Sequence, residues 1–253
     1  LTEFFGPVLG VMRFEGLQEA IDIVNETGYG LTSGLETLDD REQAIWTEGI
    51  RAGNLYVNRS TTGAIVLRQP FGGMGKSCFG PGMKAGGPNY VAQFMRFSAA
   101  PVPVADAVAS IERAGRSEFA VAHDHFRLLG QDNFRRYRPI DGLVVRVQPQ
   151  DTEDEIAIDA SARRASWIHV GDSRLYAIRA GKVGRVRFAA PDRVPDVVRL
   201  AAAQTGTCLS DAPVVPEGRV ELLWYVHEQS VSNDYHRYGN LGPRADEERA
   251  VVA

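Results

Sequence analysis

Residues 53–89 decide the fold, and they read GNLYVNRSTTGAIVLRQPFGGMGKSCFGPGMKAGGPN. The first part, residues 54–58, is a short apolar run that predicts a buried strand. From residue 63 to residue 89 glycine and proline become frequent, and neither helical nor strand periodicity is recognisable. A loop of this length inside a compact domain is either functional or disordered. Large apolar residues such as Phe71 and Phe79 are interleaved with the glycines, which favours an ordered and functional loop.

Two helices and a short strand are expected before residue 53. The first helix starts near Leu17 and stops before Gly28, a natural C-cap, and residues 31–35 predict a strand. Asp39 or Asp40 can cap a second helix, which Gly53 would end. Strands that alternate with helices indicate an α/β arrangement. The residues expected to face inward are Leu17, Ala20, Ile21 and Val24 on the first helix, and Ala44, Ile45 and Ile50 on the second.

The second half of the chain predicts another α/β unit. A stretch rich in proline and alanine over residues 99–103 resembles a linker, so the expected division is 1–98, linker 99–103 and 104–253. The helical candidates are 104–129, 152–166 and 192–204, and the strand candidates are 142–148, 167–170, 175–178 and 220–226. The polar tail from residue 234 to residue 249 is expected to pack as an extended arm.

The overall composition is that of an ordinary globular protein with a weakly negative charge. Hydrophobic residues make up 44% and charged residues 24% of the 253 residues, and the formal net charge is −4. A nucleic-acid partner is not expected, because basic residues form no stripe. Neither a transmembrane segment nor a signal peptide is recognisable, and two distant cysteines fit a reducing compartment. We therefore expect a cytoplasmic protein, and the start at Leu1 suggests a missing amino terminus.

Two glycine patterns match nucleotide-binding motifs only in part. Residues 72–77 (GGMGKS) end like a phosphate-binding P-loop, but Pro70 stands where the first glycine belongs and lacks the N–H needed there. Residues 80–85 (GPGMKA) match a dinucleotide fingerprint without a preceding strand or a following helix. A structural or other role is the better interpretation of both.

Four segments in fixed order resemble the aldehyde dehydrogenase superfamily. They are EFFGPV at residues 3–8, NETGYGLT at 25–32, GNLYVN at 53–58 and QPFGGMGKS at 69–77. The resemblance covers about the first 97 residues, and it implies the carboxyl-terminal part of a catalytic domain that uses NAD. It also implies that Glu3 holds the hydroxyls of the nicotinamide ribose and that Phe5 packs beside the nicotinamide. A carboxylate can accept hydrogen bonds from both hydroxyls, and a flat ring limits where the hydride acceptor can lie.

Residues 60–71, STTGAIVLRQPF, narrow the resemblance to delta-1-pyrroline-5-carboxylate dehydrogenases. In these enzymes a substrate-anchor loop binds the carboxylate of L-glutamate γ-semialdehyde through two successive backbone N–H groups. The matching positions are Gly63 and Ala64, and Phe71 would line the aliphatic part of the substrate. Glycine allows close approach of an anion to the backbone, and such N–H bonds need no basic side chain. A plain turn at Thr62 and Gly63 is the alternative.

Two further segments are similar to long bifunctional proline-utilisation proteins. They are GKSCFGPGMKAGGPNY at residues 75–90 and the terminal motif at 228–242, which contains EQS and YHRYGNLG. These proteins join a proline dehydrogenase, which uses FAD, to the aldehyde dehydrogenase, and the longer ones add a non-catalytic domain related to the cofactor-binding fold. The resemblance therefore implies that residues 104–253 form that domain, that the upstream part of the same polypeptide is a partner, and that the protein is a homo-oligomer.

The catalytic cysteine of this family lies upstream of the EFFGPV motif, so the resemblance implies that no catalytic residue is present. Cys78 and Cys208 are interpreted as structural thiols. No metal site is expected, because His123 and His125 are too close in sequence to share a metal on a helix, and His236 is expected to pack. The chain alone should be inactive. The alternative function is a non-catalytic assembly module derived from an aldehyde dehydrogenase.

Overall fold

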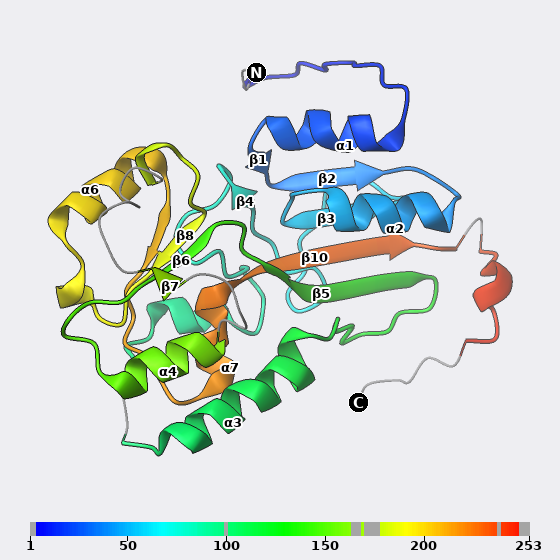
Figure 1. Ribbon diagram of the computed structural model, residues 1–253. Helices are drawn as coiled ribbons and strands as arrows, with labels where there is room; N and C mark the ends of the chain where they lie inside the picture. The colour runs from blue at the N-terminus through cyan, green and yellow to red at the C-terminus, as the bar shows by residue number, and fades with distance from the viewer. Residues whose placement is uncertain (1–3, 99–100, 163–167, 170–177, 237–238, 248–253) are drawn as a thin grey trace.

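The computed structural model describes residues 4–98, 101–162, 168–169, 178–236 and 239–247. Figure 1 shows two groups of strands, with β10 (Val226–Asp234) and β5 (Gln131–Pro139) on one side of the molecule and β6 (Leu143–Arg146) on the other. Helices accompany both groups. The predicted α/β fold class is confirmed.

The first sheet joins the beginning of the chain to its end. Its order is β2 (Thr32–Leu35), β3 (Asn54–Val57), β10 and β5. β3 pairs in parallel with β2 on one side and with β10 on the other, and β5 is antiparallel to β10. All four residues of β3 are buried, which makes it a central strand, as its apolar sequence indicates. The strands expected at 31–35 and 54–58 are confirmed.

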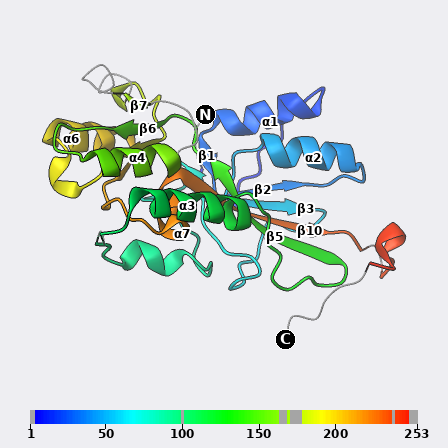
Figure 2. The same cartoon turned by 60° about the horizontal axis from the view of Figure 1, so that its bottom comes forward.

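Two helices cover one face of this sheet, as Figure 2 shows. They are α1 (Leu17–Glu26) and α2 (Asp40–Gly49). Asp39 caps α2, since its carboxylate accepts the amide N–H of Arg41 at 2.8 Å. The core beneath them contains Ile21, Trp46, Ile50, Leu55, Val57 and Val231. Val231 belongs to β10, so the last strand completes a core that the first 57 residues begin.

The inward face of α2 differs from the expected one. Three residues expected inside, Val24, Ala44 and Ile45, are exposed. Ile50 is buried as expected, and Trp46 takes the inner position in place of Ile45, because successive helix residues are turned by about 100°. α2 ends at Gly49 and not at Gly53, since the chain becomes extended at Ile50.

The second sheet is parallel throughout. Its order is β7 (Ile168–His169), β6, β8 (Arg185–Arg187) and β9 (Cys208–Ser210). The helices α4 (Glu153–Ala162) and α6 (Asp196–Thr205) accompany it, and Gly206 ends α6 with a φ of +70°. Val144, Ile178, Val186 and Phe188 belong to its core. The predicted strands 142–148 and 167–170 contain β6 and β7, and the helices predicted at 152–166 and 192–204 correspond to α4 and α6.

Two predictions for the second half of the chain are wrong in part, and a third concerns residues outside the described ranges. The helix expected over 104–129 ends early: α3 (Val104–Ala114) continues only through η2 (Gly115–Phe119), after which Asp124 accepts the amides of Phe126 and Arg127 in a turn. The strand expected at 220–226 is helical up to Tyr225, as α7 (Gly218–Glu221) and η5 (Leu222–Tyr225), because a short apolar run has no periodicity that tells helix from strand. The strand expected at 175–178 lies outside the described residues, except for Ile178, which is helical.

The glycine-rich segment is ordered and folds against the first sheet. β4 (Met74–Gly75) pairs with β1 (Tyr29–Gly30), and Phe71 exchanges two backbone hydrogen bonds with Ala85, both of 2.9 Å. Gly53 lies so close to Gly72 that a Cβ atom added to Gly53 would be 1.9 Å from the carbonyl oxygen of Gly72. The remaining short helical turns are η1 (Tyr90–Phe94), η4 (Pro191–Arg193) and η6 (Gly242–Arg244).

We predict that Gly53→Ala destabilises the protein by about 1–3 kcal/mol, because backbone atoms must move to admit the methyl group. Urea denaturation followed by circular dichroism measures the loss. Gly10→Ala is the control, since a Cβ there meets nothing within 4 Å, and it should leave the midpoint nearly unchanged. Equal midpoints for Gly53→Ala and the wild type would contradict this close approach.

Candidate functional site

The predicted anchor loop leaves β3 and is closed at its base. Asn58 and Leu67 have φ values of +56° and +60°, so the backbone turns sharply at both. Ile65 and Gln69 face each other across an antiparallel bridge, with N···O distances of 3.2 and 2.7 Å. The hydroxyl of Tyr56 donates to the carbonyl oxygen of Gly63 at 2.7 Å. The loop is therefore held from β3 as well as at its own neck.

Two successive amide groups at the tip of this loop are free. Gly63 and Ala64 are both exposed, and their N–H groups donate to none of the described residues. Gly63 has a φ of +122°, a region that only glycine adopts easily. The carbonyl of Gly63 is engaged by Tyr56, so the N–H is the backbone polar group that this residue leaves available. Two adjacent backbone donors can bind an anion.

The other predicted site residues are placed unequally. Phe71 lies half-buried where the loop ends, fixed by its backbone pairing with Ala85. Phe5 lies in the extended segment that leads into α1 and is 94% exposed, so its ring packs on almost nothing. Glu3 lies outside the described residues. Gly63, Ala64 and Phe71 thus belong to one ordered loop segment, and the binding roles of all five residues remain predictions.

Lys84 is a fully buried lysine in the glycine-rich segment. Its Nζ donates to the carbonyl oxygen of Gly72 and lies 3.3 Å from Oδ1 of Asn54. Burial lowers the pKa of Lys84 to about 7, and the carboxylate of Glu228 opposes this shift in part. Lys84 therefore ties the glycine-rich segment to the start of β3, next to the anchor loop.

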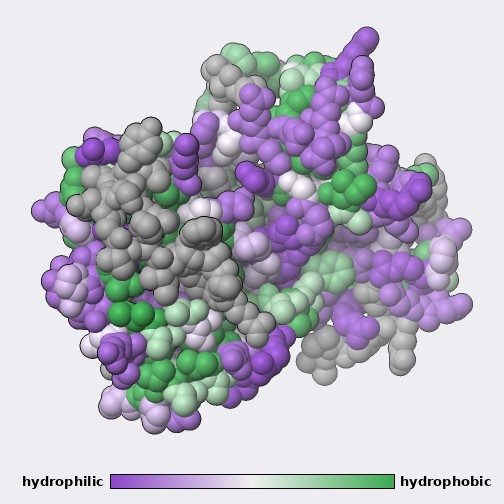
Figure 3. All heavy atoms as spheres, in the orientation of Figure 1, coloured by the Kyte–Doolittle hydropathy of each residue, from purple (hydrophilic) through white to green (hydrophobic). Residues whose placement is uncertain are grey.

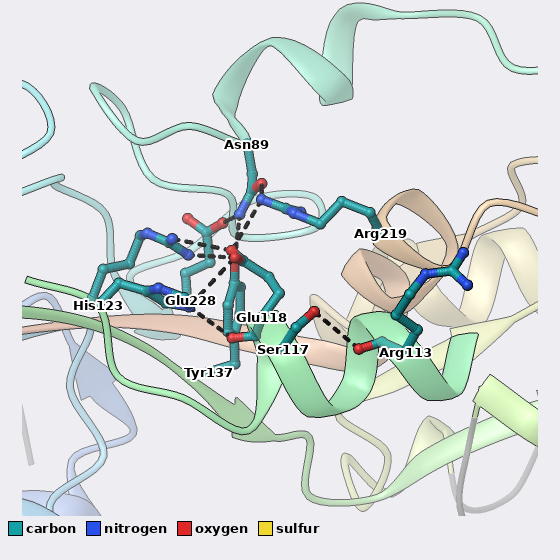
Figure 4. A network of polar contacts seen from close by, with 9 residues as sticks. Asn89, Arg113, Ser117, Glu118, His123, Tyr137, Arg219 and Glu228 are labelled. Carbon is teal, nitrogen blue, oxygen red and sulfur yellow. Dashed lines mark hydrogen bonds and ion pairs between the residues drawn. The ribbon is translucent and has the colours of Figure 1, made fainter. Parts of the chain in front are cut away.

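A second polar network lies behind the glycine-rich segment, and Figure 4 shows its members converging on Glu118 of η2. Glu118 accepts from Tyr137 at 2.8 Å and from Arg135 at 3.0 Å, and it pairs with Arg219 at 3.1 Å. Burial alone raises the pKa of Glu118, but the Tyr137 hydrogen bond and the two arginines outweigh it and lower that pKa. Asn89 joins this network by donating to the hydroxyl of Tyr137 at 2.8 Å.

The terminal EQS motif connects the last strand to the first 98 residues. Glu228 accepts the amide N–H of Lys84 at 2.9 Å and the side-chain N–H of Asn89. Gln229 donates to the carbonyl oxygen of Ala52 at 2.8 Å, and the hydroxyl of Ser230 donates to the carbonyl oxygen of Pro70 at 2.6 Å. Each of the three side chains thus bonds to a segment more than 130 positions earlier in the chain.

These contacts could not be found from the sequence. Lys84, Asn89 and Glu228 lie in segments that the resemblance singled out, but nothing in either segment identifies the other as its partner. Glu118 and Tyr137 lie in regions without a recognised motif.

Burial raises the pKa of both Cys78 and Cys208, which lowers the thiolate fraction that a nucleophile needs.

Neither a metal-binding cluster nor a membrane-spanning helix occurs among the described residues. They contain no group of three or more histidine, cysteine or acidic side chains that could hold a metal ion. They also contain no helix that is both long and apolar enough to cross a membrane. His123 and His125 do not lie on a helix, contrary to the assumption made from the sequence, and their rings stack with centroids 6.4 Å apart.

Comparison with known proteins confirms the resemblance to the aldehyde dehydrogenase family. The model of that family matches residues 1–99 of the chain, which contain the anchor loop and the glycine-rich segment. Residues 1–99 are therefore similar to aldehyde dehydrogenases.

Within this class the chain is similar to PutA proteins. The bifunctional protein PutA of Rhizobium meliloti is 52% identical over 103 residues, which are 40% of this chain and 8% of PutA. The 1-pyrroline-5-carboxylate dehydrogenase of Staphylococcus haemolyticus is 43% identical over 96 residues, 37% of this chain and 18% of that enzyme. The structure of PutA from Corynebacterium freiburgense superposes with a TM-score of 0.75 and 37% identity, covering 93% of this chain and 26% of that one. The sequence matches thus span under a fifth of these relatives, whereas the structural match includes most of residues 104–253.

We predict that Lys84→Met removes a pH dependence of stability. Between pH 7 and about 10 the unfolded chain keeps a proton on Lys84 that the folded chain has released, so this lysine makes the wild type more stable as pH rises. The free energy of unfolding, measured at several pH values in that window, should rise more steeply for the wild type than for the variant. Lys182→Met, at an exposed lysine, should keep the wild-type slope. Parallel curves for the wild type and Lys84→Met would contradict the low pKa.

Proposed function

We propose that this chain supplies part of the active site of an L-glutamate γ-semialdehyde dehydrogenase, which oxidises that aldehyde to glutamate with NAD in proline breakdown. The observation that carries the proposal is the pair of free N–H groups at Gly63 and Ala64, on a loop fixed by Tyr56. Two backbone donors can bind the carboxylate that distinguishes this substrate from simple aldehydes. The names of the PutA and 1-pyrroline-5-carboxylate dehydrogenase relatives support the same reaction.

The residues of this chain bind and orient, and the proposal assigns none of them to bond making or breaking. Gly63 and Ala64 hold the carboxylate end of the substrate, and Phe71 lines its aliphatic part. Glu3 holds the nicotinamide ribose, and the exposed ring of Phe5 offers a flat face to the nicotinamide. NAD, when bound, supplies the hydride acceptor. The catalytic cysteine comes from an upstream part of the same polypeptide, and we place the protein in the cytoplasm as a homo-oligomer.

For residues 104–253 we propose a non-catalytic supporting role. It is favoured by the position of β10, which lies between β3 and β5 and bonds to the glycine-rich segment through Glu228 and Ser230. The alternative function is that the whole chain is a non-catalytic assembly module and takes no part in an enzyme's active site. The active-site role requires that Glu3, Phe5 and the anchor loop converge on one pocket, which an assembly module does not require. Glu3 lies outside the described residues.

The complete gene product that contains these residues should form NADH from NAD and L-glutamate γ-semialdehyde. Butanal is the same molecule with hydrogen atoms in place of the carboxylate and amino groups. Its kcat/KM should be at least about tenfold lower. Ala64→Pro deletes one of the two N–H groups and should bring the two efficiencies closer together. Residues 1–253 alone should form no NADH.

Two results would contradict the proposal in different ways. If butanal and the semialdehyde are oxidised equally well, the carboxylate anchor is wrong. If the folded gene product oxidises neither aldehyde, the proposed dehydrogenase activity is wrong, and only the supporting role of residues 104–253 stands.

A further inference from the structure

The anchor loop is held from behind by side chains of the carboxyl-terminal half. Arg68 and Gln69, at the closing end of the loop, bond to two residues of β5: Nε of Arg68 donates to Gln131 at 3.1 Å, and the amide of Gln69 donates to Asn133 at 3.1 Å. Gln69 and Asn133 are both buried. These bonds join residues more than 60 positions apart, so they fix the loop relative to the sheet and not merely relative to its own ends.

The strand β10 completes this set of contacts. Gln131 donates to the carboxylate of Asp234, and that carboxylate lies 3.7 Å from Nη1 of Arg59 at the opening end of the loop. Asn133 also accepts from the hydroxyl of Ser232 at 2.9 Å. A continuous chain of contacts therefore runs from one end of the loop to the other through residues of β5 and β10.

The contacts reach the tip of the loop through Gln69 and Arg59. A Cβ atom on Gly63 would lie 3.2 Å from Oε1 of Gln69 and 3.8 Å from Nη2 of Arg59, so both side chains stand directly behind the tip. Oε1 of Gln69 and Nε and Nη1 of Arg59 are buried and have no hydrogen-bond partner among the described residues. The side chains of Gln69 and Arg59 thus lie next to Gly63, whose N–H is the first of the two free groups.

We propose that Asn133 and Asp234, with Gln131 between them, are positioning residues that set the specificity of the anchor loop for a carboxylate-bearing aldehyde. This inference rests on the proposed function. None of the three is placed at the substrate; each acts through Gln69, Arg68 or Arg59. A bound carboxylate depends strongly on the placement of its backbone donors, so displacement of the loop weakens binding of the semialdehyde more than it weakens binding of an aldehyde without a carboxylate.

The test is steady-state kinetics of Asn133→Ala and Asp234→Asn in the complete gene product. Each variant should raise KM for L-glutamate γ-semialdehyde by about tenfold while kcat falls much less, so that the kcat/KM ratio of the semialdehyde to butanal drops. Arg138→Ala is the matched control, since Arg138 also lies on β5 but pairs with Glu48 at the other end of the strand. It should keep the wild-type ratio.

Trypsin cleavage after Arg59 and Arg68 in residues 1–253 gives a second readout that needs no enzymatic activity. Both substitutions should speed cleavage at these two arginines, and Arg138→Ala should not. Asp234→Asn keeps the test decisive if Asn133→Ala fails to fold, because Asp234 is 24% exposed and its replacement retains an acceptor for Gln131.

The possible outcomes are distinct. If the variants keep the wild-type ratio of kcat/KM for the semialdehyde to kcat/KM for butanal, with or without an equal loss for both, the positioning role is overturned. The proposed function is then unaffected. A wild-type protein that oxidises butanal but not the semialdehyde would end the proposed function, and the specificity role with it.

Discussion

The parallel pairing of β10 with β3 is the contact on which the rest of the structure depends. β3 carries the anchor loop at its carboxyl end, and it is a central strand only because β10 lies beside it. β10 in turn holds β5, which carries Gln131 and Asn133 behind that loop. Without β10 the polar edge of β3 would be exposed, and Val231 would be missing from the core beneath α1 and α2. β10 thus supports the strand that carries this loop near the beginning of the chain.

The junction around this pairing is polar and buried. Asn54, Lys84 and Glu228 are all buried, and each finds a partner in another segment. Hydrogen bonds between buried polar groups add little net stability, but the loss of one partner costs about 1–3 kcal/mol because the other is left unsatisfied. Such a junction strongly disfavours any register other than the observed one. This explains how a strand that arrives about 170 residues later can be placed beside β3 without ambiguity.

The sequence predicted local structure well and long-range pairing poorly. The cap at Asp39, the buried strand beginning at Asn54 and the ordered glycine-rich segment follow from local rules. The insertion of β10 does not, because alternation along a strand says nothing about its neighbour. Trp46 replaced Ile45 on the inner face of α2, since tertiary packing decides between adjacent apolar residues. At the candidate site, the motif resemblance singled out Gly63 and Ala64, whereas the contacts of Asn133 and Asp234 with that loop appear only in the folded chain.

The most direct test of this account is native-state hydrogen exchange of β3 and β10, followed by mass spectrometry. If β10 is an integral strand, the amides of residues 53–57 and 226–234 exchange in one cooperative opening, with the same free energy and the same response to denaturant. If β10 exchanges rapidly while β3 stays protected, the last strand is only a peripheral arm. The dependence of the anchor loop on the carboxyl-terminal half would then be contradicted.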